Sequence, residues 1–229
     1  MSNIETTSRV VEEIKSNGGK AYAALGDLAT DEGAKRVAEK ALLVLGTINI
    51  LVNNAGAYPL SGWMDSVPSE WTELYNLNVT SMVRTIQLIV PQMRELGWGR
   101  VIQMASGVGT KPMAMAHYST TKAANINMTV SLAQELAGTG ITVNAVSPGP
   151  ILTPGLNEMM LKIGEAQGWG TDLEEIKKRL LQGMMSNPLG RLGTVEDVAH
   201  AVTLLCSPLS DYINGANLRV DGGWVPTIN

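Results

Sequence analysis

Residues 101–150 read VIQMASGVGTKPMAMAHYSTTKAANINMTVSLAQELAGTGITVNAVSPGP. A short apolar run at 100–104 and another at 141–146 stand on either side of a helical pattern at 115–136. Gly138 ends that pattern, as glycine commonly does at the carboxyl end of a helix. A helix between two short apolar strands is the unit from which parallel sheets are built. The stretch therefore predicts two parallel strands joined by a crossover helix.

The same alternation of strands and helices continues on both sides of this stretch. The predicted strands are at 20–25, 48–52 and 216–220, and the predicted helices are at 4–16, 31–45, 69–96 and from 194 onward. Ser69 is the expected N-cap of the longest helix, and Thr194 forms a capping box with Asp197. Repeated strand–helix units indicate a parallel sheet covered on both faces. The predicted fold for residues 1–229 is a single doubly wound, Rossmann-like α/β domain.

Residues 153–187 interrupt this alternation with a polar, Met-rich segment. Its apolar members are Leu156, Met159, Met160, Ile163, Met184 and Met185. Because the segment leaves directly from the end of a predicted strand, we expect it to be an inserted substrate lid. The alternative is that these Met side chains belong to an ordinary core.

Composition limits the classes of partner and location. The chain has 229 residues, one cysteine and a formal charge of −4, which argues against nucleic acid and anionic membranes as partners. There is no apolar window of about 18 residues and no apolar signal core, so we expect a cytoplasmic protein. Cys206 is expected to be a small buried hydrophobe rather than a nucleophile. The sequence predicts no metal site.

The residues with the clearest chemistry are Tyr118 and Lys122. Four residues apart on a helix, the two side chains project from the same face. An ordinary phenol, with a pKa of about 10, is a poor acid or base at neutral pH. A nearby ammonium lowers that pKa and would let the pair move a proton to or from an alcohol oxygen. Taken alone, this spacing is also common on solvated helix faces.

Small and polar residues follow three successive predicted strands. Ser106 follows the strand at 100–104, Asn53-Asn54-Ala55-Gly56 follows 48–52, and Ser147-Pro148-Gly149-Pro150 follows 141–146. In α/β proteins, ligands bind at the carboxyl ends of the strands. The Ser106 hydroxyl could there donate a hydrogen bond to a carbonyl oxygen that gains charge. Each segment taken alone can also be an ordinary turn, but three together favour one shared crevice.

With these residues in place, the sequence closely resembles the short-chain dehydrogenase/reductase family over essentially its whole length. The matching stretches are GDL at 26–28, NNAG at 53–56, LNV at 77–79, ASGVG at 105–109, YSTTK at 118–122, VNAVSPGPILT at 143–153 and NGANLRVDGGW at 214–224. The resemblance implies interconversion of a small-molecule alcohol and carbonyl with NAD or NADP. It does not by itself separate this reaction from that of a related epimerase or dehydratase.

The resemblance also implies roles for individual residues. Tyr118 would be the general acid/base, Lys122 would lower its pKa and hold the nicotinamide ribose, Ser106 would orient the substrate oxygen, and Asn78 would hold a proton-relay water. The residues implied in cofactor binding are Asp27, Leu28, Asn54, Ala55, Gly56, Tyr118, Lys122, Pro148, Gly149, Ile151 and Thr153. Outside this set, His117 is expected to be a lining or surface residue, because neighbours on a helix do not share a face.

One expected motif has no match. The family begins with a strand, a Gly-rich turn of the type TGxxxGIG, a helix and a second strand, and no stretch of this sequence corresponds to them. The sheet is therefore expected to lack its first strand–helix–strand unit. One edge of the strand at 48–52 then has no neighbour, unless the strand at 20–25 or another chain pairs with it, or unless the sequence omits residues of the protein. We favour the last alternative, because the catalytic set is intact.

Two further expectations concern function and assembly. A cofactor-free binding or structural subunit is the alternative to an enzyme, and it rests on the missing phosphate turn. The strand that would choose between NAD and NADP has no match either. The apolar helices at 69–96 and 115–136 are expected to pair across subunits, as they do in the family, to give a homodimer or homotetramer.

Overall fold

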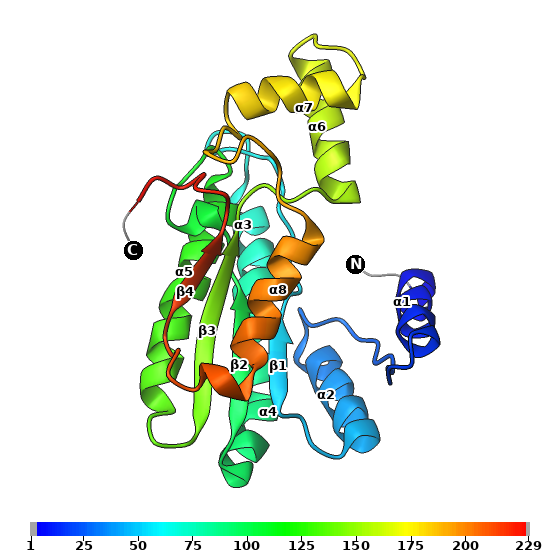
Figure 1. The fold of residues 1–229 in the computed structure, drawn as a ribbon, viewed down its shortest axis with the longest axis vertical. Coiled ribbons are helices and arrows are strands. Elements are labelled where there is room, and N and C mark those ends of the chain that lie inside the picture. The colour runs from blue at the N-terminus through cyan, green and yellow to red at the C-terminus, as the bar shows by residue number, and fades with distance from the viewer. Residues whose placement is uncertain (1–3, 228–229) are drawn as a thin grey trace.

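The computed structural model describes residues 4–227 and contains a sheet of four strands in the order β1-β2-β3-β4 (Figure 1). The strands are β1 (Ile50–Asn53), β2 (Gly99–Met104), β3 (Ile141–Pro148) and β4 (Asn217–Val220). All neighbouring strands are parallel, and Val101 lies opposite Val143 in the two central strands. The parallel, Rossmann-like α/β fold expected from the sequence is confirmed.

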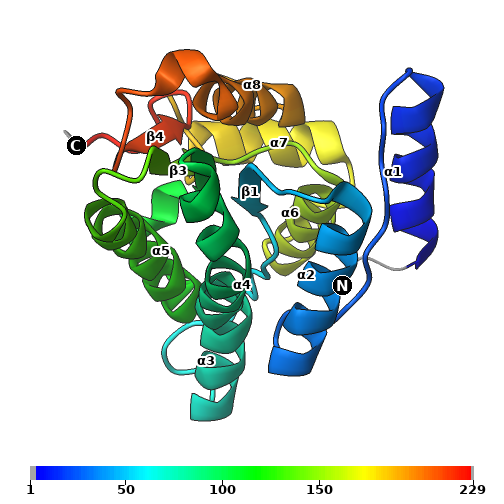
Figure 2. The same ribbon diagram turned by 90° about the horizontal axis from the view of Figure 1, so that it is seen from below.

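The helices cover both faces of this sheet. They are α1 (Ile4–Ser16), α2 (Asp31–Leu45), α3 (Pro68–Tyr75), α4 (Ser81–Leu96), α5 (Ala116–Glu135), α6 (Pro154–Ala166), α7 (Leu173–Gln182) and α8 (Val195–Cys206). Figure 2 shows α4 and α5 on one side of the sheet, α8 on the other, and α1 outside α2. None of the helices within residues 4–227 is long and apolar enough to cross a membrane.

Two apolar layers join the helices to the sheet. On one face, Met93 of α4 packs with Val101 and Val143, which are all fully buried. On the other face, Leu205 of α8 packs with Val146 of β3. Burial of a side chain of this size stabilises the fold by roughly 1.5–3 kcal/mol. The carboxyl ends of β1, β2 and β3 are thus held side by side, as the crevice hypothesis requires.

The segment 20–25, predicted to be a strand, is irregular in the structure. Tyr22 is 58% exposed and Leu25 is 44% exposed, and within the described residues β1 pairs with β2 alone. A strand needs a neighbour to bond its backbone groups, and this segment has none. It therefore does not close the gap beside β1. Within the described residues Ile50 and Val52 are partly exposed on that strand.

The helix predicted at 69–96 is divided into α3, a π-helical segment (Asn76–Thr80) and α4. It begins after Val67 instead of Ser69, because Pro68 occupies the first helical position and the Glu70 carboxylate accepts a hydrogen bond from the Val67 N–H at 3.1 Å. It ends at Gly97 as predicted. A π-helical segment inside a longer helix is frequent at functional sites, and this one carries Asn78.

Residues 153–187 form α6 and α7, which lie above the carboxyl ends of the strands in Figure 1. These helices have an apolar cluster of their own, composed of Leu156, Met160, Ile176, Leu180, Met185 and Leu192. The Met residues are therefore divided between two roles. Met160 and Met185 are buried in this cluster, whereas Met184 is 48% exposed.

Candidate active site

Tyr118 and Lys122 lie on the first turns of α5, directly beside the end of β2. The Lys122 ammonium is 5.7 Å from the centre of the Tyr118 ring and donates to the carbonyl oxygen of Met104 at 2.7 Å. The Ser106 side chain is a hydrogen-bonding neighbour of the Tyr118 hydroxyl. The structure therefore brings Ser106, Tyr118 and Lys122 together, as the sequence predicted.

The two ionisable groups are shifted in opposite directions by the same cause. Burial raises the pKa of Tyr118, while the hydrogen bond from Ser106 opposes that rise and the neighbouring Tyr58 adds to it. Burial also lowers the pKa of Lys122 from 10.5 to about 8. The pKa of Tyr118 is therefore raised overall, and Lys122 is not among the causes of its shift. At neutral pH the pair is a neutral phenol beside an ammonium.

Asn78 is fully buried behind these residues and fastens the loop that follows β1. Its amide oxygen accepts from the Ala57 N–H at 2.8 Å, and its amide nitrogen donates to the Ala57 carbonyl at 2.9 Å and to the Thr121 hydroxyl at 3.1 Å. A Cβ added at Gly56 would lie 3.0 Å from the Asn78 amide oxygen and 3.9 Å from the Lys122 ammonium. Glycine at position 56 therefore lets the NNAG loop approach both side chains.

An open cavity of about 900 Å³ lies in front of Tyr118. Of the residues predicted to form the site, it is lined by Asn54, Ser106, Tyr118, Pro148, Gly149, Ile151 and Thr153. The carboxyl ends of three strands thus meet at one cavity, as the sequence indicated. Asn78 and Lys122 are buried and do not line it, and the exposed Ala55 and Gly56 are not among its lining residues either.

Asp27 and Leu28 do not line this cavity. They form the turn that precedes α2, in which the Asp27 carboxylate accepts from the Ala29 N–H at 2.9 Å. The same turn is held to the π-helical segment, because the Asn76 amide donates to the Ala29 carbonyl at 2.8 Å and Arg84 donates to the Leu28 carbonyl at 3.3 Å. These two residues are therefore separate from the residues around Tyr118.

Some of the remaining lining residues carried no sequence signal, such as Tyr58, Leu60, Met113 and Met115, whereas Leu156, Met159, Ile163, Met184 and Met185 were expected from the lid hypothesis. Apolar side chains form most of the remaining wall, namely Tyr58, Leu60, Val108, Met113, Met115, Leu156, Met159, Ile163, Met184, Met185 and Trp224. Tyr58 contacts the Tyr118 ring edge-on, with 6.2 Å between the ring centres. Trp224 follows the VDGG stretch that contributed to the resemblance, but its position in the fold could not be read from its spacing.

Two other residues differ from the sequence-based expectation. His117 is buried instead of lining the cavity or the surface, and its Nε2 lies 3.2 Å from the Ser61 hydroxyl, while Trp71 stacks against its ring. Cys206 is half-buried at the end of α8, where burial raises the pKa of its thiol. A thiol that is harder to ionise is a poorer nucleophile, which agrees with the predicted packing role. Within residues 4–227 no cluster of His, Cys, Asp or Glu could hold a metal ion.

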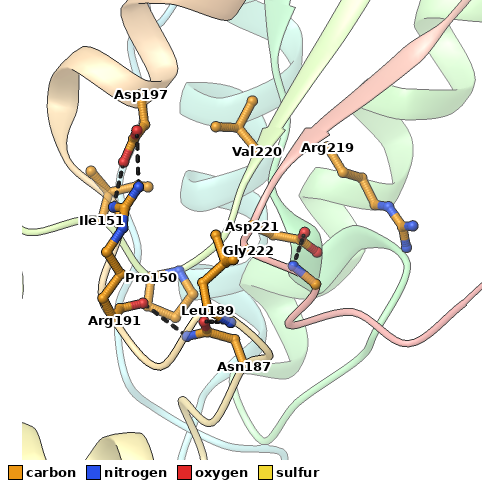
Figure 3. Close-up of a pocket in the computed structure, with 12 residues that line it drawn as sticks. Pro150, Ile151, Asn187, Leu189, Arg191, Asp197, Arg219, Val220, Asp221 and Gly222 are labelled. Carbon is orange, nitrogen blue, oxygen red and sulfur yellow. Dashed lines mark hydrogen bonds and ion pairs between the residues drawn. The ribbon is translucent and has the colours of Figure 1, made fainter.

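A smaller cavity of about 320 Å³ adjoins the first and shares Pro150 and Ile151 with it (Figure 3). Its charged groups already have partners. Arg191 forms an ion pair with Asp197 at 2.7 Å, and the Asp221 carboxylate accepts from the Gly223 and Val225 N–H groups. Figure 3 shows Arg219 directed away from the other lining residues, and its guanidinium donates to the Val225 carbonyl at 2.8 Å.

The sequence and the fold were compared with known proteins. A family profile described as enoyl-(acyl carrier protein) reductase matches residues 1–225. The uncharacterized oxidoreductase YvrD of Bacillus subtilis is 35% identical over 225 residues, which cover 98% of this chain and 84% of that protein.

Two solved structures have the same fold. The L-sorbose reductase of Gluconobacter frateurii, complexed with NADPH and L-sorbose, superposes with a TM-score of 0.92, 29% identity and coverage of 99% of this chain and 85% of that one. A 7α-hydroxysteroid dehydrogenase complexed with NADH and 7-oxo glycochenodeoxycholic acid superposes with a TM-score of 0.85 and 31% identity. The match covers 98% of this chain and 82% of that one.

Proposed function

Because the chain belongs to the short-chain dehydrogenase/reductase family, we propose that it interconverts an alcohol and a carbonyl by hydride transfer with NAD or NADP. The observation that carries the proposal is the Tyr118 phenol on the cavity wall, with Ser106 beside it and the Lys122 ammonium 5.7 Å from the centre of its ring. Structures of relatives with NADPH and with NADH support the choice of cofactor.

The residues around Tyr118 fit the reactive end of such a cofactor. Lys122 is 6% exposed, and the Met104 carbonyl is one acceptor for an ammonium that has three donors. It would hold the hydroxyls of the nicotinamide ribose, with Asn54 beside it and Pro148 to Thr153 along the nicotinamide. The fit ends there, because the sequence contains no turn of the TGxxxGIG type for the pyrophosphate. The bound cofactor would supply or accept the hydride.

The chain's own residues would orient the substrate and move one proton. A substrate oxygen placed between Ser106 and Tyr118 can accept a hydrogen bond from both hydroxyls. In reduction, the neutral Tyr118 phenol gives its proton to that oxygen as negative charge develops. The raised Tyr118 pKa suits this direction, because the phenol is protonated at neutral pH. The side chain of Asn78 would position the loop at 54–57, through the two hydrogen bonds to Ala57.

The proposal can be tested directly on the 229-residue chain. NADH and NADPH are titrated separately by calorimetry, and turnover with a ketone panel is then measured from the loss of reduced cofactor. Saturable binding of either nucleotide together with turnover supports the enzyme. A chain that is folded by circular dichroism but binds neither nucleotide would favour the alternative of a cofactor-free binding or structural subunit.

We also propose that residues 153–187, which include α6 and α7, form a substrate lid over the cavity. Met159, Met184 and Met185 of this segment line the cavity, and the helices have their own apolar cluster, so they can move as one body. The two chain segments that join them to the sheet bond each other, with Gly193 N–H to Pro150 O at 3.0 Å and Leu152 N–H to Gly193 O at 2.8 Å. Hydrogen exchange should slow in this segment when cofactor and substrate bind, and unchanged exchange would contradict a lid.

Finally, we propose a cytoplasmic homodimer or homotetramer. The single cysteine excludes an intrachain disulfide within the sequence, and the family resemblance supports pairing of α4 and α5 between subunits. Closed symmetry would then give a two- or four-chain assembly. Light scattering of the purified chain measures the mass, and a uniform monomer would exclude the assembly.

A further inference from the structure

The wall of the cavity around Tyr118 contains no charged side chain. Among the described residues that line the cavity, the side chains are aliphatic, aromatic, thioether, hydroxyl or amide groups. Resting on the proposed function, we propose that the substrate is an uncharged ketone, or the matching secondary alcohol, with a hydrocarbon body of at least ring size. We further infer that Trp224 determines how large that body can be.

A substrate with a charge near its carbonyl would find no partner in this wall. Lys122 lies behind the wall and donates to Met104, while Lys111 donates to the Trp224 carbonyl at 3.2 Å and lies 4.6 Å from the centre of the indole ring. Arg191 is paired with Asp197 in the smaller cavity. Desolvating a charge without a partner is strongly unfavourable, so a small keto acid or a ketose phosphate fits the cavity poorly.

A polyhydroxylated substrate would also leave hydroxyl groups without partners. Ser106 and Tyr118 are needed for the reacting oxygen, and the indole N–H of Trp224 already donates to the Met184 carbonyl at 2.9 Å. The Thr153 hydroxyl accepts from the Leu156 N–H at 3.1 Å, so the other polar side chains of the wall are those of Asn54, Tyr58 and Thr203, too few for the hydroxyls of a sugar. Each desolvated hydroxyl without a hydrogen bond lowers affinity. The wall therefore favours hydrocarbon over sugar.

Trp224 connects three separate parts of the wall. Its indole N–H holds Met184 of the segment after α7, and its carbonyl accepts from Lys111 in the loop after β2. Its ring packs closely on Gly107 of that loop, where an added Cβ would lie 3.1 Å from the indole Cζ3. Trp224 itself is 6% exposed and lines the cavity. It is thus a fixed boundary, whereas the unbranched Met side chains around it can adapt to ligands of different shape.

The test uses the full 229-residue chain and four ketones with NADH and NADPH. Decalone and methylcyclohexanone differ in the size of an apolar body, oxocyclohexanecarboxylate adds a charge to the smaller ring, and a ketohexose adds hydroxyls. We expect kcat/KM to be highest for decalone and lower by on the order of 100-fold for the carboxylate and the ketohexose. Binding of each ketone is measured independently of turnover by calorimetry.

The outcomes separate this inference from the proposed function. Turnover that favours the ketohexose or the carboxylate would overturn the apolar substrate class and leave the oxidoreductase in place. Binding of decalone without turnover of any ketone would support the apolar class and overturn the proposed reaction. Failure of all four ketones to bind or react would overturn both.

The role of Trp224 is tested with a matched pair of variants. Trp224→Leu should raise the preference for decalone over methylcyclohexanone about tenfold, because loss of the fixed boundary leaves more room for the larger body. Trp63→Leu is the control, since Trp63 is 69% exposed and does not line the cavity. Equal preference ratios in the parent chain and Trp224→Leu would remove Trp224 as the determinant. If Trp224→Leu does not fold, Trp224→Phe retains a ring but lacks the N–H that holds Met184, and the same ratio decides.

Discussion

The two adjoining cavities differ in how their polar groups are satisfied. In the smaller one, Arg191 and Asp197 pair with each other at the surface. In the larger one, Tyr118 and Lys122 are largely buried, have no carboxylate partner, and have pKa values shifted by desolvation. Perturbed, unpaired ionisable groups in a cavity indicate function, whereas paired surface charges indicate structure. The apolar cavity is therefore the better candidate site, although it has no charged lining residue.

Removal of the phenol oxygen of Tyr118 should have the largest effect on activity. Tyr118→Phe should lower turnover about 1,000-fold, because general acid/base catalysis contributes on that order. Cofactor affinity should change little, since the ring remains. Tyr58→Phe is the control, because Tyr58 lines the same cavity and contacts the same ring. Steady-state rates are measured for both variants, and near-normal turnover of Tyr118→Phe would refute Tyr118 as the general acid/base.

Removal of the ammonium should have the next largest effect. Lys122→Met should lower turnover on the order of 100-fold and weaken cofactor binding, because the same ammonium would support proton transfer by Tyr118 and hold the nicotinamide ribose. In the parent chain, activity should decline as the pH rises through about 8, where the pKa of Lys122 places its loss of charge. Lys122→Arg should abolish that decline, since a guanidinium stays protonated. An identical pH profile in the parent chain and Lys122→Arg would exclude this assignment.

The burial of Lys122 also predicts how stability depends on pH. Because burial lowers its pKa to about 8 from 10.5, the unfolded chain binds more protons than the folded chain between these values. Stability contributed by this group therefore rises from pH 8 to 10.5, by about 3 kcal/mol in total. Lys122→Met has no ionisable group at this position, so its free energy of unfolding should fall relative to that of the parent chain between pH 8 and 10.5. Denaturant unfolding at several pH values measures the difference, and a constant difference would contradict the burial effect.

The sequence predicted the centre of the molecule better than its margins. Residues 101–150 predicted β2, α5 and β3 with small errors, because each element has an apolar pattern that matches its own period. Residues 20–25 have an equally apolar pattern but are not a strand, since a strand depends on a neighbour that a local pattern does not contain. The π-helical segment at Asn78 was missed for a related reason, because one extra residue per turn leaves the polar and apolar pattern almost unchanged.

The candidate active site could also be predicted only as far as local sequence patterns reach. Spacing on one helix was enough to bring Tyr118 and Lys122 together, and strand ends were enough to bring Ser106 and Asn54 to the same cavity. The local sequence could not predict that burial raises the pKa of Tyr118, because burial depends on the packing of the whole domain. Nor could it place Trp224, which reaches the cavity from near the end of the chain.

The smallest effect is expected in the other cavity. Asp197→Asn removes the charge that pairs with Arg191 but keeps an oxygen that can accept from the Thr194 N–H at the start of α8. The hydrogen bond from Arg191 lowers the pKa of Asp197 to about 2 from 3.8, so the stability from this pair is present above pH 3.8 and lost as the pH falls toward 2. Because 52% of the Arg191 side chain and 34% of the Asp197 side chain are exposed, solvent screens the pair, and the thermal midpoint at neutral pH should fall only slightly. Calorimetric scans of the parent chain and the variant should converge near pH 2, while kcat and KM should stay within about twofold of the parent values. A large loss of activity in Asp197→Asn would show that the smaller cavity takes part in catalysis, and the distinction between the two cavities would fail.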